Sequence, residues 1–296
     1  MTLSPRVVLV HRRSEYDELV GRHGSPGQAA FFLSTRGRDI AEVLAHHEAQ
    51  TEAMRVASTA IPSSWRRGEV ERVDLARFLF SPEDVVVVVG QDGLVPNVAK
   101  YLDGQPVIGI DPEPGRNPGV LVRHRAADAG ELMLAAVAGE AALSRLTMVQ
   151  AEADDGQRLL ALNEIYIGHA SHQTARYAVT VPGGPSERQA SSGVVVGTGT
   201  GATGWCSSIW RERHSALVLP EPAEPVLVWF TREAWVSPVT GDALTEGRLG
   251  VEPLLVTVES NRLVAFGDGI EDDHLTLGWG QQVRIGLADR GLQLVV

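Results

Sequence analysis

The stretch Val85-Val86-Val87-Val88-Val89-Gly90-Gln91-Asp92-Gly93 (residues 85–93) joins five consecutive valines to a short turn with a glycine at each end. A run of β-branched residues without polar alternation is typical of a strand buried on both faces, as in a parallel sheet. The surrounding segments alternate in type, with strands predicted at Arg6–Val10 and Pro106–Ile110 and helices at Arg38–Ala57, Leu94–Leu102 and Gly130–Leu143. This alternation predicts an α/β fold with helices on the faces of a parallel sheet.

The length and composition of the chain exclude several classes of protein. The chain has 296 residues, with 26 Lys and Arg against 37 Asp and Glu, which gives a formal charge of −11. The length suits one large or two ordinary domains, and the acidic balance argues against a nucleic-acid partner. A single cysteine, Cys206, excludes an intramolecular disulfide framework and a cysteine-built zinc site. It fits a reducing cytosol.

No segment predicts targeting or membrane insertion. The basic residues His11-Arg12-Arg13 follow the first apolar run, whereas a secretory signal places its basic residues before it. The long uncharged stretch Ser191–Trp210 is built from Gly, Ser and Thr, which does not suit a bilayer. We expect a soluble, cytoplasmic protein.

The predicted secondary structure changes near residue 145, and after this point most segments are predicted to be strands. Strands are predicted at Arg158–Ile167, Thr174–Val181, Gly193–Gly197, Val226–Phe230, Leu254–Glu259, Leu263–Phe266, Gln281–Leu287 and Leu292–Val296. In this second half, a helix is predicted only at Thr203–Arg213. In the first half, Ser63–Arg72 is predicted to be a charged loop or a linker between elements. We therefore expect an α/β domain at 1–145 and a mostly antiparallel, β-rich domain at 146–296.

Gly90-Gln91-Asp92-Gly93 lies directly after the valine strand, where open α/β sheets bind ligands. Glycines there allow backbone N–H groups to approach a phosphate closely. The carboxylate of Asp92 would repel phosphate, so its presence suggests that it accepts a proton from a hydroxyl or helps to hold Mg²⁺. An ordinary turn that leads into the next helix remains the alternative.

A second glycine-rich loop is Thr198-Gly199-Thr200-Gly201-Ala202-Thr203-Gly204. Gly199, Gly201 and Gly204 match the G-x-G-x-x-G spacing, but the loop lies in the β-rich half and no strand ending in an acidic residue follows it. A loop rich in hydroxyl and N–H groups suits polar ligand groups. A merely structural strand–turn–helix is equally consistent with it.

Asn163 and Glu164 interrupt an apolar strand, and polar residues there need partners if they are buried. Their donors and acceptors suit ribose hydroxyls, while a solvated strand face is the alternative. Gly267-Asp268-Gly269 predicts a hairpin turn.

Taken together, these segments resemble the NAD kinase family. The family shows, in order, a Gly-x-Asp-Gly loop after a hydrophobic strand, an Asn-Glu strand and a Thr-x-Thr-Gly loop before a helix. The resemblance is closest to the branch that includes the mitochondrial NAD kinases, whose third loop reads Thr-Gly-Thr-Gly, as in Thr198–Gly201, after Ser-Ser-Gly, as in Ser191-Ser192-Gly193. Further counterparts are Pro106–Ile110 with Arg116 and Gly119, Arg232-Glu233, and Asp268-Gly269.

The resemblance implies a Rossmann-like N-terminal domain, a β-sandwich-like C-terminal domain, an active site between the domains and a homodimer. The substrates would be NAD and ATP, with Mg²⁺ accompanying ATP. Asp92 would activate the 2′-hydroxyl of the adenosine ribose. Residues that bind the nucleotides would be Gly90, Gln91, Gly93, Arg116, Asn163, Glu164, Ser192, Thr198, Gly199, Thr200, Gly201 and Asp268.

Two residues depart from the family pattern and keep other functions open. Gln91 stands where the family has a second glycine, and Asp111 stands where Asn is common. The alternatives are a non-catalytic relative that binds a dinucleotide, and a kinase for another hydroxyl substrate such as a lipid or a sugar alcohol.

Overall fold

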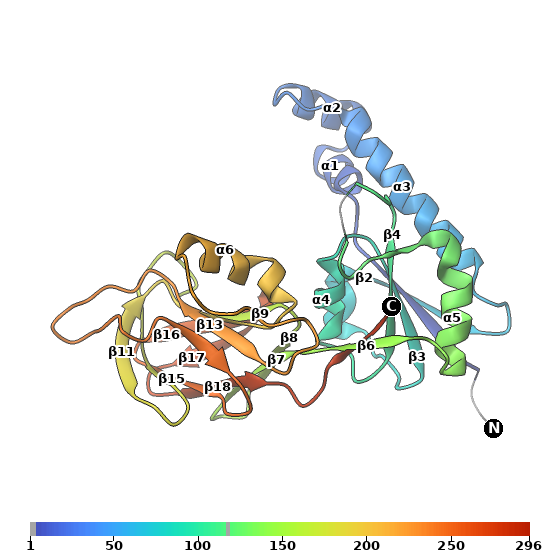
Figure 1. The fold of residues 1–296 in the computed structure, drawn as a ribbon. Coiled ribbons are helices and arrows are strands. Elements are labelled where there is room, and N and C mark those ends of the chain that lie inside the picture. The colour runs from blue at the N-terminus through green and yellow to red at the C-terminus, as the bar shows by residue number, and fades with distance from the viewer. Residues whose placement is uncertain (1–3, 117–118) are drawn as a thin grey trace. The chain divides into compact units, whose positions relative to one another are not determined.

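The computed structural model describes residues 4–116 and 119–296, and the chain divides into two compact units (Figure 1). The first unit comprises the residues up to Ser144 together with Gln293–Val296, and the second comprises Arg145–Leu292. The first is built on a largely parallel sheet with helices, and the second on two antiparallel sheets. The predicted fold class, an α/β domain followed by a β-rich domain, is confirmed.

The sheet of the first unit has the strand order β2-β1-β3-β4-β19-β6, with the short strand β5 beside β4. Strands β1 to β4 and β19 pair in parallel. The valine run forms β3, and each of its residues is buried, as its composition predicts. The strand bounds are β1 Arg6–His11, β2 Arg66–Glu71, β3 Asp84–Val89, β4 Pro106–Asp111, β5 His124–Arg125, β6 Leu143–Leu146 and β19 Leu292–Val295.

Helices of the first unit cover this sheet and extend from it. Ala53 and Ala57 of α3 and Met133 of α5 pack with the strands in one apolar cluster. The sequence predicts a helix over Gly130–Leu143, but α5 ends at Ala138 because Gly139 takes a left-handed conformation with φ of 72°. The bounds are α1 Glu15–His23, α2 Pro26–Ser34, α3 Ile40–Thr59, α4 Leu94–Ala99, α5 Ala129–Ala138, and the 3₁₀ segments η1 Arg72–Arg77 and η2 Ala126–Asp128.

The expectation of a loop or linker at Ser63–Arg72 is wrong, because most of this segment forms strand β2. β2 pairs with β1 on one side only and lies at the edge of the sheet. Charged side chains are tolerated at an edge, where they also discourage pairing with other chains. Because the strand prediction relied on runs of apolar residues, it did not detect this charged strand.

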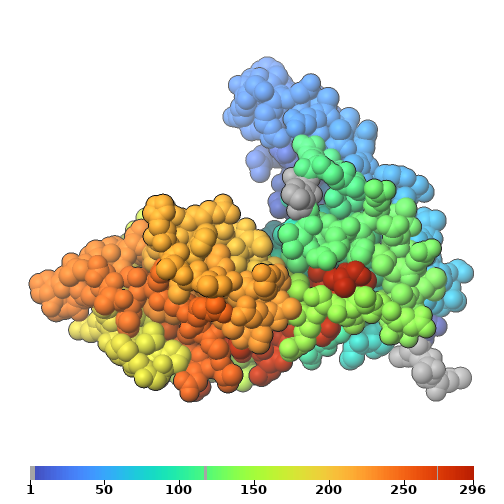
Figure 2. Space-filling model, viewed as in Figure 1, coloured from blue at the N-terminus to red at the C-terminus, as the bar shows by residue number. Residues whose placement is uncertain are grey.

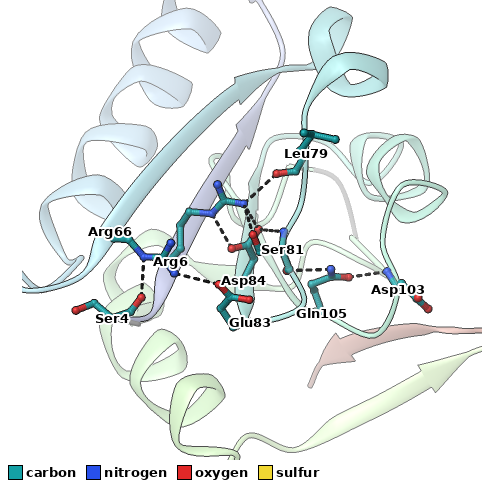
Figure 3. Close-up of polar contacts among 9 residues, drawn as sticks. All are labelled: Ser4, Arg6, Arg66, Leu79, Ser81, Glu83, Asp84, Asp103 and Gln105. Atoms are coloured by element: carbon teal, nitrogen blue, oxygen red, sulfur yellow. Dashed lines mark hydrogen bonds and ion pairs between the residues drawn. The ribbon is translucent and has the colours of Figure 1, made fainter. Parts of the chain in front are cut away.

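A buried ion pair joins the starts of β1 and β3 (Figure 3). The guanidinium of Arg6 donates from Nε and Nη2 to the two carboxylate oxygens of Asp84 at 2.7 and 2.6 Å. Asp84 is fully buried and also accepts the backbone N–H of Ser81 at 2.7 Å. The bidentate hydrogen bonds offset the desolvation of the buried carboxylate and join the two strands at this point.

The C-terminal strand β19 belongs to the sheet of the first unit. It pairs in parallel with β4, with Gln293 opposite Pro106 and Leu294 opposite Val107. Figure 2 shows these red C-terminal residues among the green residues of the first unit. The expected second domain, 146–296, therefore differs from the observed unit at its end, since the last four residues rejoin the first unit.

The second unit packs two antiparallel sheets on one apolar core. The sheet orders are β11-β10-β15-β18-β7-β8 and β14-β13-β12-β9-β16-β17. Their inward side chains form one cluster of buried residues, which includes Tyr177 and Trp229. The bounds are β7 Val149–Ala153, β8 Arg158–Ala161, β9 Glu164–Gly168, β10 Ala175–Thr180, β11 Ser186–Ser191, β12 Val194–Gly197, β13 Leu227–Thr231, β14 Glu246–Leu249, β15 Leu254–Val258, β16 Arg262–Gly267, β17 Ile270–Gly278 and β18 Gln282–Leu287.

The second unit also carries a helix, α6 (Trp205–Glu212), preceded by the 3₁₀ segment η3 (Gly201–Thr203). Cys206 and Ile209 of α6 pack on the outer side of β12 and β13. Cys206 is fully buried, and burial raises the pKa of its thiol. Across the described ranges 4–116 and 119–296, no helix is both long and apolar enough to cross a membrane.

Candidate functional site

Asp92 follows β3, and its carboxylate is bound by the backbone of a distant loop. Oδ1 accepts the N–H groups of Leu121 and Val122 at 3.0 and 2.9 Å. Oδ2 accepts the N–H of Val120 at 2.7 Å. Because a carboxylate oxygen accepts about two hydrogen bonds, Oδ1 is saturated, whereas Oδ2 has one acceptor position left unused among residues 4–116 and 119–296. Asp92 therefore anchors this loop and can still accept one further hydrogen.

Gly119 makes this close approach possible. A Cβ at this position would lie 2.3 Å from the carbonyl oxygen of Val122 and 3.2 Å from Oδ1 of Asp92. Any side chain would therefore clash with the carbonyl of Val122 and distort the loop that donates to the carboxylate. The backbone donors of the 120–122 segment were not predicted, since every residue has an N–H and the sequence carries no signal for its direction.

The other residues of the Gly90–Gly93 turn lead the chain from β3 into α4. The N–H of Gly90 donates to the carbonyl of Ile110, and the N–H of Leu94 donates to the carbonyl of Gln91. Gln91 is exposed, and among the described residues it is not one of the non-glycine residues with positive φ. Its backbone conformation is therefore accessible to any residue, and the turn does not require glycine there.

Arg116, another predicted nucleotide ligand in the first unit, is held by acidic side chains. Its guanidinium lies 3.3 Å from Glu42 of α3 and 3.4 Å from Glu113. His46 contacts the same carboxylate of Glu113 at 2.7 Å. This network anchors the loop after β4 to α3. Asp111, at the end of β4, accepts the N–H of Glu113 at 2.9 Å and so stabilises the same loop.

In the second unit, Asp268 binds the chain where it crosses from one sheet to the other. The prediction of a single strand over Arg158–Ile167 is wrong, because the chain leaves β8 after Ala161 and enters β9 at Glu164. The two sheets differ, so Asn163 lies at a corner and not in mid-strand. Oδ2 and Oδ1 of Asp268 accept the N–H groups of Leu162 and Asn163 at 2.9 and 2.7 Å.

The conformation of Asp268 itself depends on a tight turn. Asp268 and Gly269 connect β16 to β17, with φ values of 55° and 68°. Two-residue hairpin turns of this kind need positive φ at both positions, which Asp and Gly supply readily. The predicted hairpin turn at Gly267-Asp268-Gly269 is confirmed.

Thr198 joins the glycine-rich loop to the same corner. Its hydroxyl donates to the carbonyl of Leu162 at 2.6 Å and accepts the N–H of Thr200 at 3.1 Å. Its own N–H donates to the carbonyl of Asn163 at 2.9 Å. A Cβ on Gly201 would lie 2.2 Å from that carbonyl oxygen, so only glycine fits at this position. The structure thus brings together three motifs that are far apart in the sequence.

Two side chains at this corner retain unused hydrogen-bonding capacity. The hydroxyl oxygen of Thr200 is buried and has no hydrogen-bond partner within the described part of the chain. Glu164 is partly buried, and burial together with the nearby charge of Asp268 raises its pKa to about 7. Buried polar atoms are normally paired in proteins, so this arrangement favours a polar ligand at the corner. We call Asn163, Glu164, Thr198, Thr200, Gly201 and Asp268 the corner site.

Two further predicted residues lie away from the corner site. Ser192 precedes β12, while Thr198 follows it, so the strand separates them. The carbonyl of Ser192 accepts the hydroxyl of Tyr166 at 2.9 Å. Gly199 packs against the backbone of Glu221 and Pro222, where a Cβ would lie 2.1 Å from the carbonyl oxygen of Glu221. Its role in the structure is therefore close packing.

The next feature is the set of side chains that could bind a metal ion. No group of three or more His, Cys, Asp or Glu side chains suited to a metal occurs in residues 4–116 and 119–296. The remaining lone pair on Oδ2 of Asp92 could hold either one metal-ligand bond or a proton, but not both at once. Mg²⁺ usually takes one or two carboxylates together with substrate phosphates and water. The residues therefore fit an ion that arrives with a nucleotide.

The fold defines a two-domain protein with an open α/β sheet in one unit and a β-sandwich-like second unit. The first unit carries Asp92 and the loop that it binds, and the second carries the corner site. The same fold occurs in yeast NADH kinase, in a structure complexed with NADH, at a TM-score of 0.61 and 12% identity over 100% of this chain and 84% of that one. It also occurs in an NAD kinase from Archaeoglobus fulgidus in complex with ATP, at a TM-score of 0.58 and 16% identity over 98% and 93%. No protein-family model and no curated protein sequence matches the chain.

Proposed function

We propose that the protein is an ATP-dependent NAD kinase, which transfers a phosphoryl group to the 2′-hydroxyl of the adenosine ribose of NAD. The observation that carries the proposal is the corner site. There the buried hydroxyl of Thr200 has no partner among the described residues, and the carboxyl of Glu164, whose pKa is raised to about 7, lies next to Asn163. Ribose hydroxyls both donate and accept hydrogen bonds, so a carboxylate, an amide and a hydroxyl suit them. The shared fold with proteins that bind NADH and ATP supports the choice of ligands.

Asp92 takes the role of general base in this proposal. The ribose oxygen attacks the terminal phosphorus of ATP, the bond to the bridging oxygen breaks and ADP leaves. The hydroxyl proton passes to Oδ2 of Asp92, the oxygen with an acceptor position left unused by the described residues. Mg²⁺ bound to ATP supplies charge neutralisation on the phosphates.

A coupled assay tests the proposal directly. Purified protein incubated with NAD and Mg-ATP should form NADP, and a chain with Glu164→Gln should form it more slowly because the amide accepts fewer hydrogen bonds. In the control, NADP replaces NAD and the release of ADP is followed; no ADP should form, since the 2′-hydroxyl of NADP is already phosphorylated. Absence of NADP formation by the wild-type protein over a range of pH and Mg-ATP concentrations would refute the kinase.

A second function is favoured by one specific observation. Three backbone N–H groups occupy Asp92, so this carboxylate already has a structural task. In a protein that binds a dinucleotide without phosphorylating it, holding this loop would be the whole role of Asp92. NAD that raises the melting temperature without any NADP formation would favour this binding function.

A further inference from the structure

A pocket of about 390 Å³ lies in the first unit, near the carboxyl ends of β4 and β5. This volume lies within the range of about 300–1,000 Å³ that small-molecule sites occupy. Gly115 and Gly119 contribute backbone to its wall, so a ligand can approach the main chain closely. The charged and titratable side chains that line it are Asp111, Arg123, His124 and Arg125.

The pocket is basic in a protein that is strongly acidic. The whole chain carries a formal charge of −11, yet Arg123 and Arg125 outnumber the single carboxylate, Asp111. That carboxylate already accepts the N–H of Glu113 at 2.9 Å. A local positive potential in an acidic molecule concentrates anions at one place and not over a whole surface.

The donors of this pocket are only partly used. The side chain of Arg123 donates from Nε and Nη2 to the carbonyl of Val120, which leaves Nη1 available. His124 donates from Nε2 to the carbonyl of Val295 at 3.0 Å, which fixes its ring. Arg125 is exposed, and within the described ranges its guanidinium has no hydrogen bond or ion pair. An unpaired guanidinium presents five N–H donors in a planar fork that suits phosphate oxygens.

The pocket also shares a chain segment with Asp92. Gly119 and Val122 line it, and the N–H of Val122 donates to Oδ1 of Asp92. A ligand held by Arg125 would therefore lie against the loop that Asp92 anchors. This proximity matters because phosphoryl transfer depends mainly on positioning and on charge stabilisation.

We propose that Arg123 and Arg125 bind the phosphate chain of a nucleotide or of a free polyphosphate in this pocket. The proposal that the pocket binds an anion depends only on the residues of the pocket. That the bound chain is the phosphoryl donor rests on the proposed kinase function. The residues of the turn at Gly90–Gly93 do not line this pocket, so it is a second set of phosphate contacts.

Calorimetric titration of the wild-type protein with sodium tripolyphosphate and, separately, with ATP tests the assignment. We expect both to bind, and Arg125→Ala to weaken both about tenfold or more, because it removes charge-assisted contacts. Arg125→Lys should give intermediate affinity, since it keeps the charge and loses the planar fork. Tighter binding of ATP than of tripolyphosphate would identify a nucleotide, and equal binding would identify the free chain.

Arg77→Ala is the matched control, since Arg77 is an exposed arginine at the end of η1 in the same unit. It removes the same charge and should leave both affinities unchanged. Equal losses in Arg77→Ala and Arg125→Ala, or no binding of either anion by the wild-type protein, would overturn the proposal. Anion binding that depends on Arg125 in a protein without kinase activity would leave the pocket intact and refute only its role with the donor.

Discussion

Oδ1 of Asp268 lies 2.7 Å from the backbone nitrogen of Asn163, across 105 positions of sequence. The other carboxylate oxygen holds Leu162 at 2.9 Å, so one side chain fixes the chain at the crossing between two sheets. In return, the N–H of Asp268 donates to the carbonyl of Glu164 at 3.2 Å. The turn and the corner therefore hold each other in place, and the orientation of Asn163 and Glu164 depends on both.

Asp268→Ala should destabilise the protein and disorder the corner site. It removes the acceptor of two backbone N–H groups, that of Leu162, which is buried, and that of Asn163, which is partly buried, and the loss for a buried group costs about 1–3 kcal/mol. Urea unfolding should show the lower stability, and calorimetry should show weakened NAD binding. Asp242→Ala, at an exposed position in the same unit, should change stability by less than about 0.5 kcal/mol. Unaltered NAD binding by Asp268→Ala would contradict the anchoring role.

Stability should depend on pH through Glu164. The folded protein keeps this proton up to about pH 7, whereas the unfolded chain loses it near the ordinary value of 4.5. The folded state thus binds more protons between these values, so the free energy of unfolding falls as pH rises through this window. At about 1.4 kcal/mol per pKa unit, the loss amounts to about 3 kcal/mol.

Glu164→Gln is the control for this pH effect, because the amide does not titrate. Its unfolding free energy, measured by urea denaturation from pH 4.5 to 8, should lack this decline. If NAD binds through the carboxylate form of Glu164, the affinity of the wild-type protein should rise with pH over the same window. Identical pH profiles for the two proteins would show that Glu164 does not titrate there.

Asp92→Asn should depress turnover by about 10²–10⁴, the usual loss for a general base. The amide nitrogen would face the N–H of Val120, so the loop should also lose about 1 kcal/mol of hydrogen bonding. NAD affinity should hold, because Asp92 does not belong to the corner site. Steady-state kinetics and calorimetry measure the two effects, with the exposed Asp74→Asn as control. A change in affinity with full turnover would assign Asp92 to loop anchoring alone.

Gly201→Ala should abolish NAD binding by displacing the glycine-rich loop. Its Cβ would lie 2.2 Å from the carbonyl oxygen of Asn163, a distance that requires the backbone to move. Gly250→Ala is the paired control, since a Cβ at this exposed glycine of the same unit would meet no atom within 4 Å. Thermal shift with NAD compares the two variants. Equal shifts would show that the loop adapts and that its packing on Asn163 is not required.

Arg6→Ala should destabilise the first unit, since among the described residues it leaves the buried carboxylate of Asp84 with the Ser81 N–H as its one remaining partner. Removal of one member of a buried pair costs about 3–5 kcal/mol, and the 21% exposure of Arg6 favours the lower end. Chemical denaturation measures the loss. Arg66→Ala, whose partner Glu83 is exposed, should cost less than about 1 kcal/mol. Equal effects would mean that the Arg6 pair contributes no more than a surface contact.

Much of the fold could be predicted from local pattern. The valine run identified β3 because burial on both faces demands apolar residues throughout. β2 was missed because an edge strand can carry charges. Gly139 ends α5 earlier than predicted; glycine is the usual left-handed residue that stops a helix, but the prediction followed the alanine-rich run past it.

The candidate residues were predictable as motifs but not as a site. Asn163-Glu164 and Thr198–Gly201 stood out because polar or glycine-rich runs interrupt apolar segments. Their contact depends on Thr198 bonding to the carbonyls on both sides of the corner. Pairings across tens of residues follow from packing, which local sequence does not encode.

By itself, the sequence determined the two-part organisation, the buried strands, the Asp-Gly turn and the residue types available for chemistry, because these depend on local periodicity and backbone preference. Only the tertiary structure decided that Asp268 binds the backbone of Asn163, that three N–H groups occupy Asp92, and that the last strand returns to the first sheet. These are long-range hydrogen bonds, and their partners are selected by which segments the packed sheets bring together.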